Sequence, residues 1–307
     1  MTFSRRDFLA SSASALAVGL GSRRAFAQAA APQPPPETKF VDLRRGVGMF
    51  IGSGGTIGYL VNGAGAVAID SQFANTATIA VAGLKTRTPK GIEMLLNTHH
   101  HGDHTGGNLV FRGAVNRIVG HVQCLEWHKK TAAAAKSESQ TSFADTTFTD
   151  SWKSDFGDEV IQARYYGPGH TSGDAVYHLE KANVVHLGDL LFNRAHPNID
   201  RAAGASTGNW ITVLERVAKA HANDAIFIAG HAKNNSVQCA KADVLRFRDY
   251  LSLCMDTAKK AIAAGQAKEE LQKMTALKGF EDNASPNARL TLGFVLGLCY
   301  DELTEKK

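Results

Sequence analysis

The stretch Asn97–Asn108 reads N-T-H-H-H-G-D-H-T-G-G-N, and it decides most of what the sequence says about fold and chemistry. Imidazole and carboxylate groups are the side chains that bind divalent transition metals when thiolates are absent. Four of these groups form an H-x-H-x-D-H motif inside the stretch: His99, His101, Asp103 and His104. The motif therefore predicts a metal site.

The spacing within the motif explains how one short segment can serve two metal ions. The apolar run Ile92–Asn97 predicts a buried strand that ends at Thr98. The first two histidines of the motif are two residues apart, so they project from the same side of an extended segment. Gly102 then lets the chain turn sharply. The aspartate and the last histidine consequently reach the other side of the same small space, at the mouth of a helix.

Three further side chains of metal-ligand type lie downstream, each where a predicted strand meets a loop: His170 in G-P-G-H-T-S-G-D, Asp189 in H-L-G-D-L-L-F and His231 in I-A-G-H. His170 is expected to join His99 and His101 around a first metal. His231 is expected to join the aspartate and the last histidine of the motif around a second, and Asp189 can bridge the two. Five imidazoles and two carboxylates suit two Zn²⁺ ions per chain, and such a set can also hold Fe or Mn.

A solvated histidine-rich loop or an N-capping aspartate would explain any single one of these residues, but not the whole pattern. The motif T-H-x-H-x-D-H-x-G-G and its partners resemble those of metallo-β-lactamase-fold hydrolases, over about Val47–Ala232. This resemblance implies an α/β fold, a four-layer αββα sandwich with the metals at one edge between two sheets. The family's ligands fall on seven positions of this sequence: His99, His101, Asp103, His104, His170, Asp189 and His231.

The resemblance also narrows the expected activity. True class B β-lactamases usually carry Cys or Ser where Asp189 stands, whereas Asp is similar to the glyoxalase II-like and lactonase-like branches. We therefore expect a dinuclear zinc hydrolase that uses a metal-bound hydroxide on an ester, thioester, lactone or amide bond of a small molecule. Class B-like β-lactamase activity and a mono-iron persulfide dioxygenase of the same fold are the alternatives, and a non-catalytic metal-binding protein is a third class.

Some residues are expected to act on water or substrate. Asp103 is the predicted catalytic residue, because a carboxylate beside the hydroxide can orient it and shuttle its proton. Three side chains of the loop after Asp189 are predicted to hold an anionic or carbonyl group of the substrate: Asn193, Arg194 and His196. The alternative is that they only shape the loop. The segment Ser137–Asp155 lacks periodicity and is expected to form a mobile flap beside the site or a surface excursion.

The N-terminus predicts export. Residues 4–9, S-R-R-D-F-L, match the twin-arginine pattern, and Ala25-Phe26-Ala27 matches an A-x-A cleavage site. We therefore expect a signal peptide at 1–27, a linker at 28–40 and one hydrolase domain with a helical C-terminal part at 41–307. The expected partners are the twin-arginine export machinery and a small-molecule substrate, and the expected location is periplasmic or secreted. The apolar run is too short and too rich in Ser and Gly to anchor the chain in a membrane.

Composition excludes one class of partner and leaves two points open. The formal charge is +5, and the leader accounts for +3 of it, so the rest of the chain carries no nucleic-acid-binding excess of positive charge. The four cysteines are scattered with no C-x-x-C, which leaves their pairing open, and the oligomeric state is open too.

Periodicity and turn residues predict the order of strands and helices. The predicted strands are 46–51, 56–61, 66–69, 92–97, 117–120, 159–166, 174–179, 184–187 and 225–229. The predicted helices are 76–84, 121–137, 209–220, 240–264, 267–273 and 287–305. Core packing is the expected role of the last helix, and a dimer contact or part of a substrate-channel wall are the alternatives.

Overall fold

The computed structural model describes residues 37–285 and 287–305. The predicted signal peptide at 1–27 and most of the linker at 28–40 lie outside these residues. Strand β1 begins at Lys39, within the range predicted as linker. No helix in the described part of the chain has the length and apolar character needed to cross a bilayer.

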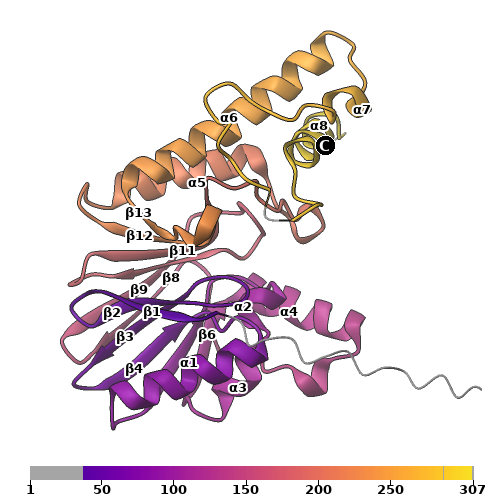
Figure 1. Cartoon of the computed structure of the whole chain (residues 1–307). Coiled ribbons are helices and arrows are strands. Elements are labelled where there is room, and N and C mark those ends of the chain that lie inside the picture. Colours follow the sequence, from indigo (N-terminus) through magenta and orange to yellow (C-terminus); the bar gives the residue numbers. More distant parts are fainter. Residues whose placement is uncertain (1–36, 286, 306–307) are drawn as a thin grey trace, which may run out of the picture. The chain divides into compact units, whose positions relative to one another are not determined.

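Two β-sheets form the centre of the described part (Figure 1). The first sheet has seven strands in sequence order, antiparallel from β1 to β4 and parallel from β4 to β7. Its strands are β1 (Lys39–Arg44), β2 (Val47–Ile51), β3 (Ile57–Asn62), β4 (Gly65–Ile69), β5 (Ile92–Asn97), β6 (Arg117–His121) and β7 (Thr146–Phe148). The helices of this half are α1 (Ala74–Arg87), α2 (Gly102–Thr105), α3 (Asn108–Arg112) and α4 (Val122–Ala135).

The second sheet has six strands in the order β13-β12-β11-β10-β9-β8, and only β11 and β12 pair in parallel. Its strands are β8 (Ser151–Phe156), β9 (Glu159–Tyr165), β10 (Ala175–Leu179), β11 (Val184–Asn193), β12 (Ile226–Ala232) and β13 (Gln238–Cys239). The helices of this half are α5 (Thr207–Ala220), α6 (Lys241–Ala263), α7 (Lys268–Leu271) and α8 (Leu292–Thr304), with α5 and α6 against the outer face of the sheet (Figure 1).

Alternation along the strands explains the layers. In β4, Val67 and Ile69 point into the apolar core shared by the two sheets. Ala66 and Ala68, on the opposite face, pack in a separate core that includes Leu84 of α1. Both faces of the strand are thus buried, because helices cover one side and the second sheet covers the other. The result is the four-layer αββα sandwich predicted from the sequence, which is confirmed.

Several predicted boundaries differ from the structure, and three of the differences are large. The segment Ser137–Asp155 is not one irregular loop, because β7 and most of β8 lie within it as edge strands. Helix α8 begins at Leu292 rather than at Asn287, whose side-chain Oδ1 accepts hydrogen bonds from two nearby backbone N–H groups and so holds a turn. Strand β11 continues to Asn193 instead of ending at Leu187. In the last helix, the expected core role is matched by the burial of Val295 and Leu296.

All four cysteines are free and buried in the structure: Cys124, Cys239, Cys254 and Cys299. They serve as small apolar side chains of the interior.

Candidate metal centre

Four of the predicted ligands meet at one end of the sandwich. His99 and His101 follow β5, His170 lies between β9 and β10, and Asp189 lies on β11. Nε2 of His99 and Nε2 of His170 lie 3.1 and 2.9 Å from Nδ1 of His101. Oδ2 of Asp189 lies 3.4 Å from Nε2 of His170. These atoms surround one point, as the ligands of a single metal ion would.

The other three predicted ligands form a second group beside the first. Asp103 and His104 lie on the short helix α2, and His231 lies on β12. Nε2 of His231 is 3.0 Å from Oδ2 of Asp103, and Nε2 of His104 is 3.8 Å from the same oxygen. Oδ1 of Asp189 is 3.0 Å from Nε2 of His104. Asp189 therefore presents one oxygen to each group, which is the arrangement of a bridging carboxylate.

The donor atoms fit metal ions of the size and geometry of Zn²⁺. Tetrahedral ligands at about 2.0–2.1 Å from zinc lie roughly 3.3 Å from one another, close to the spacings found here. Nε2 of His104 and Oδ1 of Asp189 are buried and make no hydrogen bond to any described residue, although they lie 3.0 Å apart. Buried polar atoms normally have partners, and a metal ion between them would supply one.

Two outer contacts fix the rings of the first group. Nε2 of His101 lies 2.8 Å from Oδ2 of Asp200. Nδ1 of His170 lies 2.9 Å from the backbone oxygen of Asn198. Because these acceptors need a ring N–H, they leave the opposite nitrogen of each ring with its lone pair toward the metal position.

A buried carboxylate orients the remaining two histidines near β5. Oδ2 of Asp70 lies 2.7 Å from Nδ1 of His104 and accepts a 2.7 Å hydrogen bond from the hydroxyl of Thr98. That hydroxyl lies 3.0 Å from Nδ1 of His99, so its oxygen can accept the ring proton. The Nε2 atoms of His99 and His104 are thus left with their lone pairs free to bind a metal. Asp70, Thr98, Asn198 and Asp200 were not among the predicted site residues.

Electrostatics keeps the carboxylates in the state that binds metal. Burial by itself would raise the pKa of Asp189, but the imidazoles of His231 and His104 hold it far below its usual range. Burial likewise opposes ionisation of Asp103, and His104 together with the hydrogen bond from His231 lowers its pKa to about 2. Both groups are thus ionised at neutral pH.

The imidazoles divide into two kinds. Burial lowers the pKa of His99 well below its usual value, and it lowers that of His170 to about 4, so both rings are neutral. The pKa of His104 is raised well above its usual value, because three carboxylates outweigh its burial: Asp189, Asp70 and Asp103. The space beside His104 therefore favours a positive charge.

Two glycines, Gly188 on β11 and Gly230 on β12, allow the backbone to pass close to the side chain of Asp189. Gly188 has φ +50° and lies at a register shift between these strands, so it turns Asp189 toward the site. A Cβ atom at Gly230 would lie 2.0 Å from Oδ1 of Asp189. Glycine is the only residue that leaves room for the carboxylate there.

A cavity of about 330 Å³ opens onto the two groups of ligands. His101, Asp103, Asp189 and His231 line one part of it. The rest of its wall comes from Gly102 and from five residues that are not among the predicted site residues: Phe192, Asn198, Asn287, Arg289 and Leu290. Three of these come from the loop before α8, far from the motif in sequence, and no local pattern marks them.

The three predicted substrate residues make contacts with the protein itself. Asn193 donates a 2.8 Å hydrogen bond to the backbone oxygen of Ser236. Arg194 forms an ion pair with Asp282. Nδ1 of His196 lies 2.7 Å from the hydroxyl of Tyr250. None of the three is among the described residues that line the metal cavity, and their binding of substrate stays a prediction.

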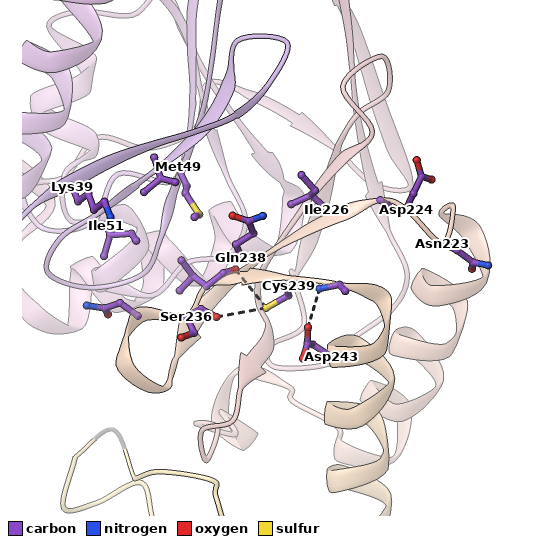
Figure 2. Close-up of a pocket in the computed structure, with 15 residues that line it drawn as sticks. Lys39, Met49, Ile51, Asn223, Asp224, Ile226, Ser236, Gln238, Cys239 and Asp243 are labelled. Atoms are coloured by element: carbon purple, nitrogen blue, oxygen red, sulfur yellow. Dashed lines mark hydrogen bonds between the residues drawn. The ribbon is translucent and has the colours of Figure 1, made fainter.

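A larger cavity, of about 700 Å³, lies between β1 and β2 of the first sheet and β12 and β13 of the second (Figure 2). The thiol of Cys239 contacts the backbone oxygen of Ser236, and the carboxylate of Asp243 accepts from the backbone N–H of Ala240 (Figure 2). No histidine is among its lining residues in the described chain. Predicted metal ligands line the smaller cavity and not this one.

Comparison with known proteins gives the family. The model of the Metallo-beta-lactamase superfamily matches residues 51–231. The chain belongs to this superfamily. The family predicted from the sequence is thus confirmed, and the converging histidines and aspartates form a cluster that could hold metal ions.

Two relatives with similar sequences have names that describe different activities. A metallo-beta-lactamase type 2 from Bacillus sp. (strain 170) is 25% identical over 170 residues, which is 55% of this chain and 63% of the relative. The chain thus spans less than two thirds of that relative's length. A hydroxyacylglutathione hydrolase from Methylococcus capsulatus is 33% identical over 99 residues, 32% of this chain and 33% of the relative.

A solved structure extends the likeness in fold. The sec-alkylsulfatase Pisa1 from Pseudomonas sp. superposes with a TM-score of 0.68 at 14% identity, over 87% of this chain and 50% of that one. The shared fold therefore covers more of the chain than the 181-residue match to the superfamily model at 51–231.

Proposed function

We propose that this protein is a dinuclear zinc hydrolase that cleaves an ester, thioester, lactone or amide bond of a small molecule. The observation that carries the proposal is the position of Asp189, whose two oxygens face two separate groups of ligands. Two bound zinc ions would lower the pKa of a shared water to about 7 and polarise the substrate carbonyl.

The residues around the cavity would orient the reacting groups. Asp103 has a side chain that is 29% exposed, whereas that of Asp189 is 5% exposed. Both carboxylates line the cavity, and Asp103 is the more exposed of the two. It is placed to accept a proton from water and release it to solvent or to the leaving group. His231 holds Oδ2 of Asp103 at 3.0 Å and thus limits its rotation.

The complete second group argues against the mono-iron alternative. An enzyme with one metal has no need for His104 and His231. Here the Nε2 atoms of both histidines lie close to Oδ2 of Asp103, so the three side chains could hold a second ion. β-Lactam hydrolysis stays a secondary candidate, supported by the type 2 metallo-beta-lactamase relative. The hydroxyacylglutathione hydrolase relative supports a thioester instead.

The proposal is tested by metal analysis followed by a substrate panel. Protein purified without chelator is expected to contain two zinc ions per chain by elemental analysis. The panel should include an aryl acetate, a glutathione thioester, a γ-lactone, a β-lactam and a secondary alkyl sulfate. The Asp189→Ala variant is the control, since loss of the bridge should remove metal and activity together. One iron per chain with oxygen-dependent turnover of a persulfide would overturn the proposal.

We also propose export through the twin-arginine route, on the strength of the sequence at 4–9 and 25–27. Replacing Arg5 and Arg6 together by Lys keeps the charge and removes the paired guanidinium groups. Precursor is then expected to stay in the cytoplasm. Mature protein found outside the cytoplasm in this variant, by cell fractionation, would contradict the assignment.

A further inference from the structure

We propose that Arg289 binds a carboxylate group of the substrate, and that the hydrolase acts on monoanionic esters or thioesters whose carboxylate lies a few bonds from the carbonyl. This inference rests on the proposed hydrolase function. It places the anion-binding group in the loop before α8, away from the predicted residues Asn193, Arg194 and His196.

The cavity is built from three kinds of wall. Asp103 and the other ligands form the first, Phe192 and Leu290 form an apolar second, and Arg289 with Asn198 forms a polar third. Its volume of about 330 Å³ lies at the small end of pockets for small molecules, roughly 300–1,000 Å³. A compact ligand that reaches the ligand groups would thus also lie near Arg289.

Arg289 is a cation without a carboxylate partner among the described residues. Its guanidinium donates to Oδ1 of Asn198 at 3.3 Å and lies 5.7 Å from the ring centre of Phe294. By contrast, Arg194 and Arg246 both pair with Asp282. A guanidinium has five N–H donors, so most of those on Arg289 are free for a ligand.

Asn198 sets the position of this cation relative to the metal ligands. Its backbone oxygen faces Nδ1 of His170 at 2.9 Å, and its side-chain oxygen accepts from Arg289. The loop itself is held by Asn287, whose Oδ1 accepts from the backbone N–H groups of Arg289 and Leu290 at 2.9 and 3.1 Å. One residue therefore connects the guanidinium to a ligand of the first group.

Charge and polarity together specify the ligand. Bound zinc ions would offset the negative charges of Asp103 and Asp189, and Arg289 would then be the cation on the cavity wall that attracts an anion. The planar guanidinium suits a carboxylate, which it can bind through two parallel hydrogen bonds. Phe192 and Leu290 offer an apolar surface for the carbon chain between the carboxylate and the scissile bond.

The test compares two 4-nitrophenyl esters, of which only the second carries a carboxylate: 4-nitrophenyl acetate and mono-4-nitrophenyl succinate. In Arg289→Met the KM for the succinate ester is expected to rise about three- to fivefold, the upper range for an ion pair at an exposed side chain such as Arg289. The kcat for this ester and both constants for the acetate should stay unchanged. Arg289→Lys should recover part of the loss, because it keeps the charge but not the planar fork.

The control variant is Arg216→Met, which removes the same charge from an exposed position on α5, outside the metal cavity. It should leave both esters unaffected. Zinc content must also stay at the wild-type value in Arg289→Met, which separates loss of the cation from loss of metal. An equal rise in KM for both esters would mean that Arg289 only supports the loop, and would overturn the inference.

A binding measurement separates this inference from the hydrolase proposal. Levulinate carries a ketone two carbons from its carboxylate and cannot be hydrolysed, and 2-pentanone is its neutral counterpart. By ligand-observed NMR, levulinate should bind the zinc-loaded wild type about three- to fivefold more tightly than the Arg289→Met variant. If no ester in the panel is cleaved but this difference holds, the hydrolase proposal fails and the anion site stands. Equal levulinate binding to both proteins would overturn the anion site, whatever the result for hydrolysis.

Discussion

The histidines of the candidate centre depend on acceptors that lie outside the motif. Asp200 and Asp70 each hold the outer nitrogen of a ring whose inner nitrogen faces the metal position. The motif residues could be predicted from the sequence because their chemistry and spacing are local. Asp70 and Asp200 could not, because each is a single carboxylate separated from its histidine by 34 and 99 positions.

Replacing Asp103 by Asn should remove most of the proposed hydrolysis. The amide keeps the shape of the side chain but is neither an anionic ligand nor a proton acceptor. The expected loss in kcat/KM is about 10²–10⁴-fold, the range of positioned acid–base groups. Steady-state kinetics of Asp103→Asn and of Asp155→Asn, an exposed control on β8, measure it. Near-wild-type rates in the first variant would show that the second metal group has no catalytic role.

Replacing Asp200 by Asn should weaken zinc binding without unfolding the chain. The amide lowers the negative charge at 2.8 Å from Nε2 of His101, so the ring becomes a poorer ligand. Outer partners of this kind typically change metal affinity by about 10–100-fold. Competition with a coloured zinc chelator gives the affinity, and Asp158→Asn at an exposed ion pair is the control. Equal affinities in the two variants would contradict this assignment.

At the scale of elements, buried strands were the easiest to predict and edge strands the hardest. Ile92–Asn97 matches β5 because its apolar residues, interrupted only by Glu93, fit a short strand that is buried on both faces. β7 was missed because it has only three residues, and β8 was missed because the polar Ser154 stands at one of its inward positions and breaks the alternation. The cavity wall from Asn287 to Leu290 was predicted as helix, since its turn depends on side-chain hydrogen bonds rather than on periodicity.

Strands β11 and β12 approach so closely at Gly230 that adding one methyl group there should disturb the metal site. In Gly230→Ala, the new Cβ would lie 2.0 Å from Oδ1 of Asp189, so the carboxylate must move from its bridging position. Zinc content should fall below two ions per chain while the circular dichroism spectrum stays unchanged. Gly63→Ala, where a Cβ meets nothing within 4 Å, should retain both ions. Full zinc content in Gly230→Ala would mean that the bridge tolerates the shift.

At the scale of the whole molecule, the ligand groups join the two sheets. Those of the motif follow β5 of the first sheet, whereas Asp189 and His231 belong to β11 and β12 of the second. The αββα architecture could be predicted because resemblance in the motif implies it. The path of the C-terminal helices and their loop across the site carries no such signature, and substrate selectivity depends on such walls.

Removing the metals should therefore lower the melting temperature. Ligand bound at about 1,000 times its Kd stabilises the folded state by about 4 kcal/mol, which corresponds to roughly 10 °C for a domain of this size. Differential scanning calorimetry with and without chelator measures the change. The Asp189→Ala variant should melt near the chelated wild type and show no further response to chelator. An unchanged melting temperature of the wild type would mean that the sheets hold together without metal.

The four buried, unpaired cysteines can report local opening of the structure, because their thiols react only when they become accessible to solvent. Cys124 belongs to the half built on the first sheet, whereas Cys239, Cys254 and Cys299 belong to the other half. A thiol-specific reagent can modify each group only while its surroundings are transiently open. The rates of modification thus record how often each half opens, and their dependence on zinc records whether the two halves open together.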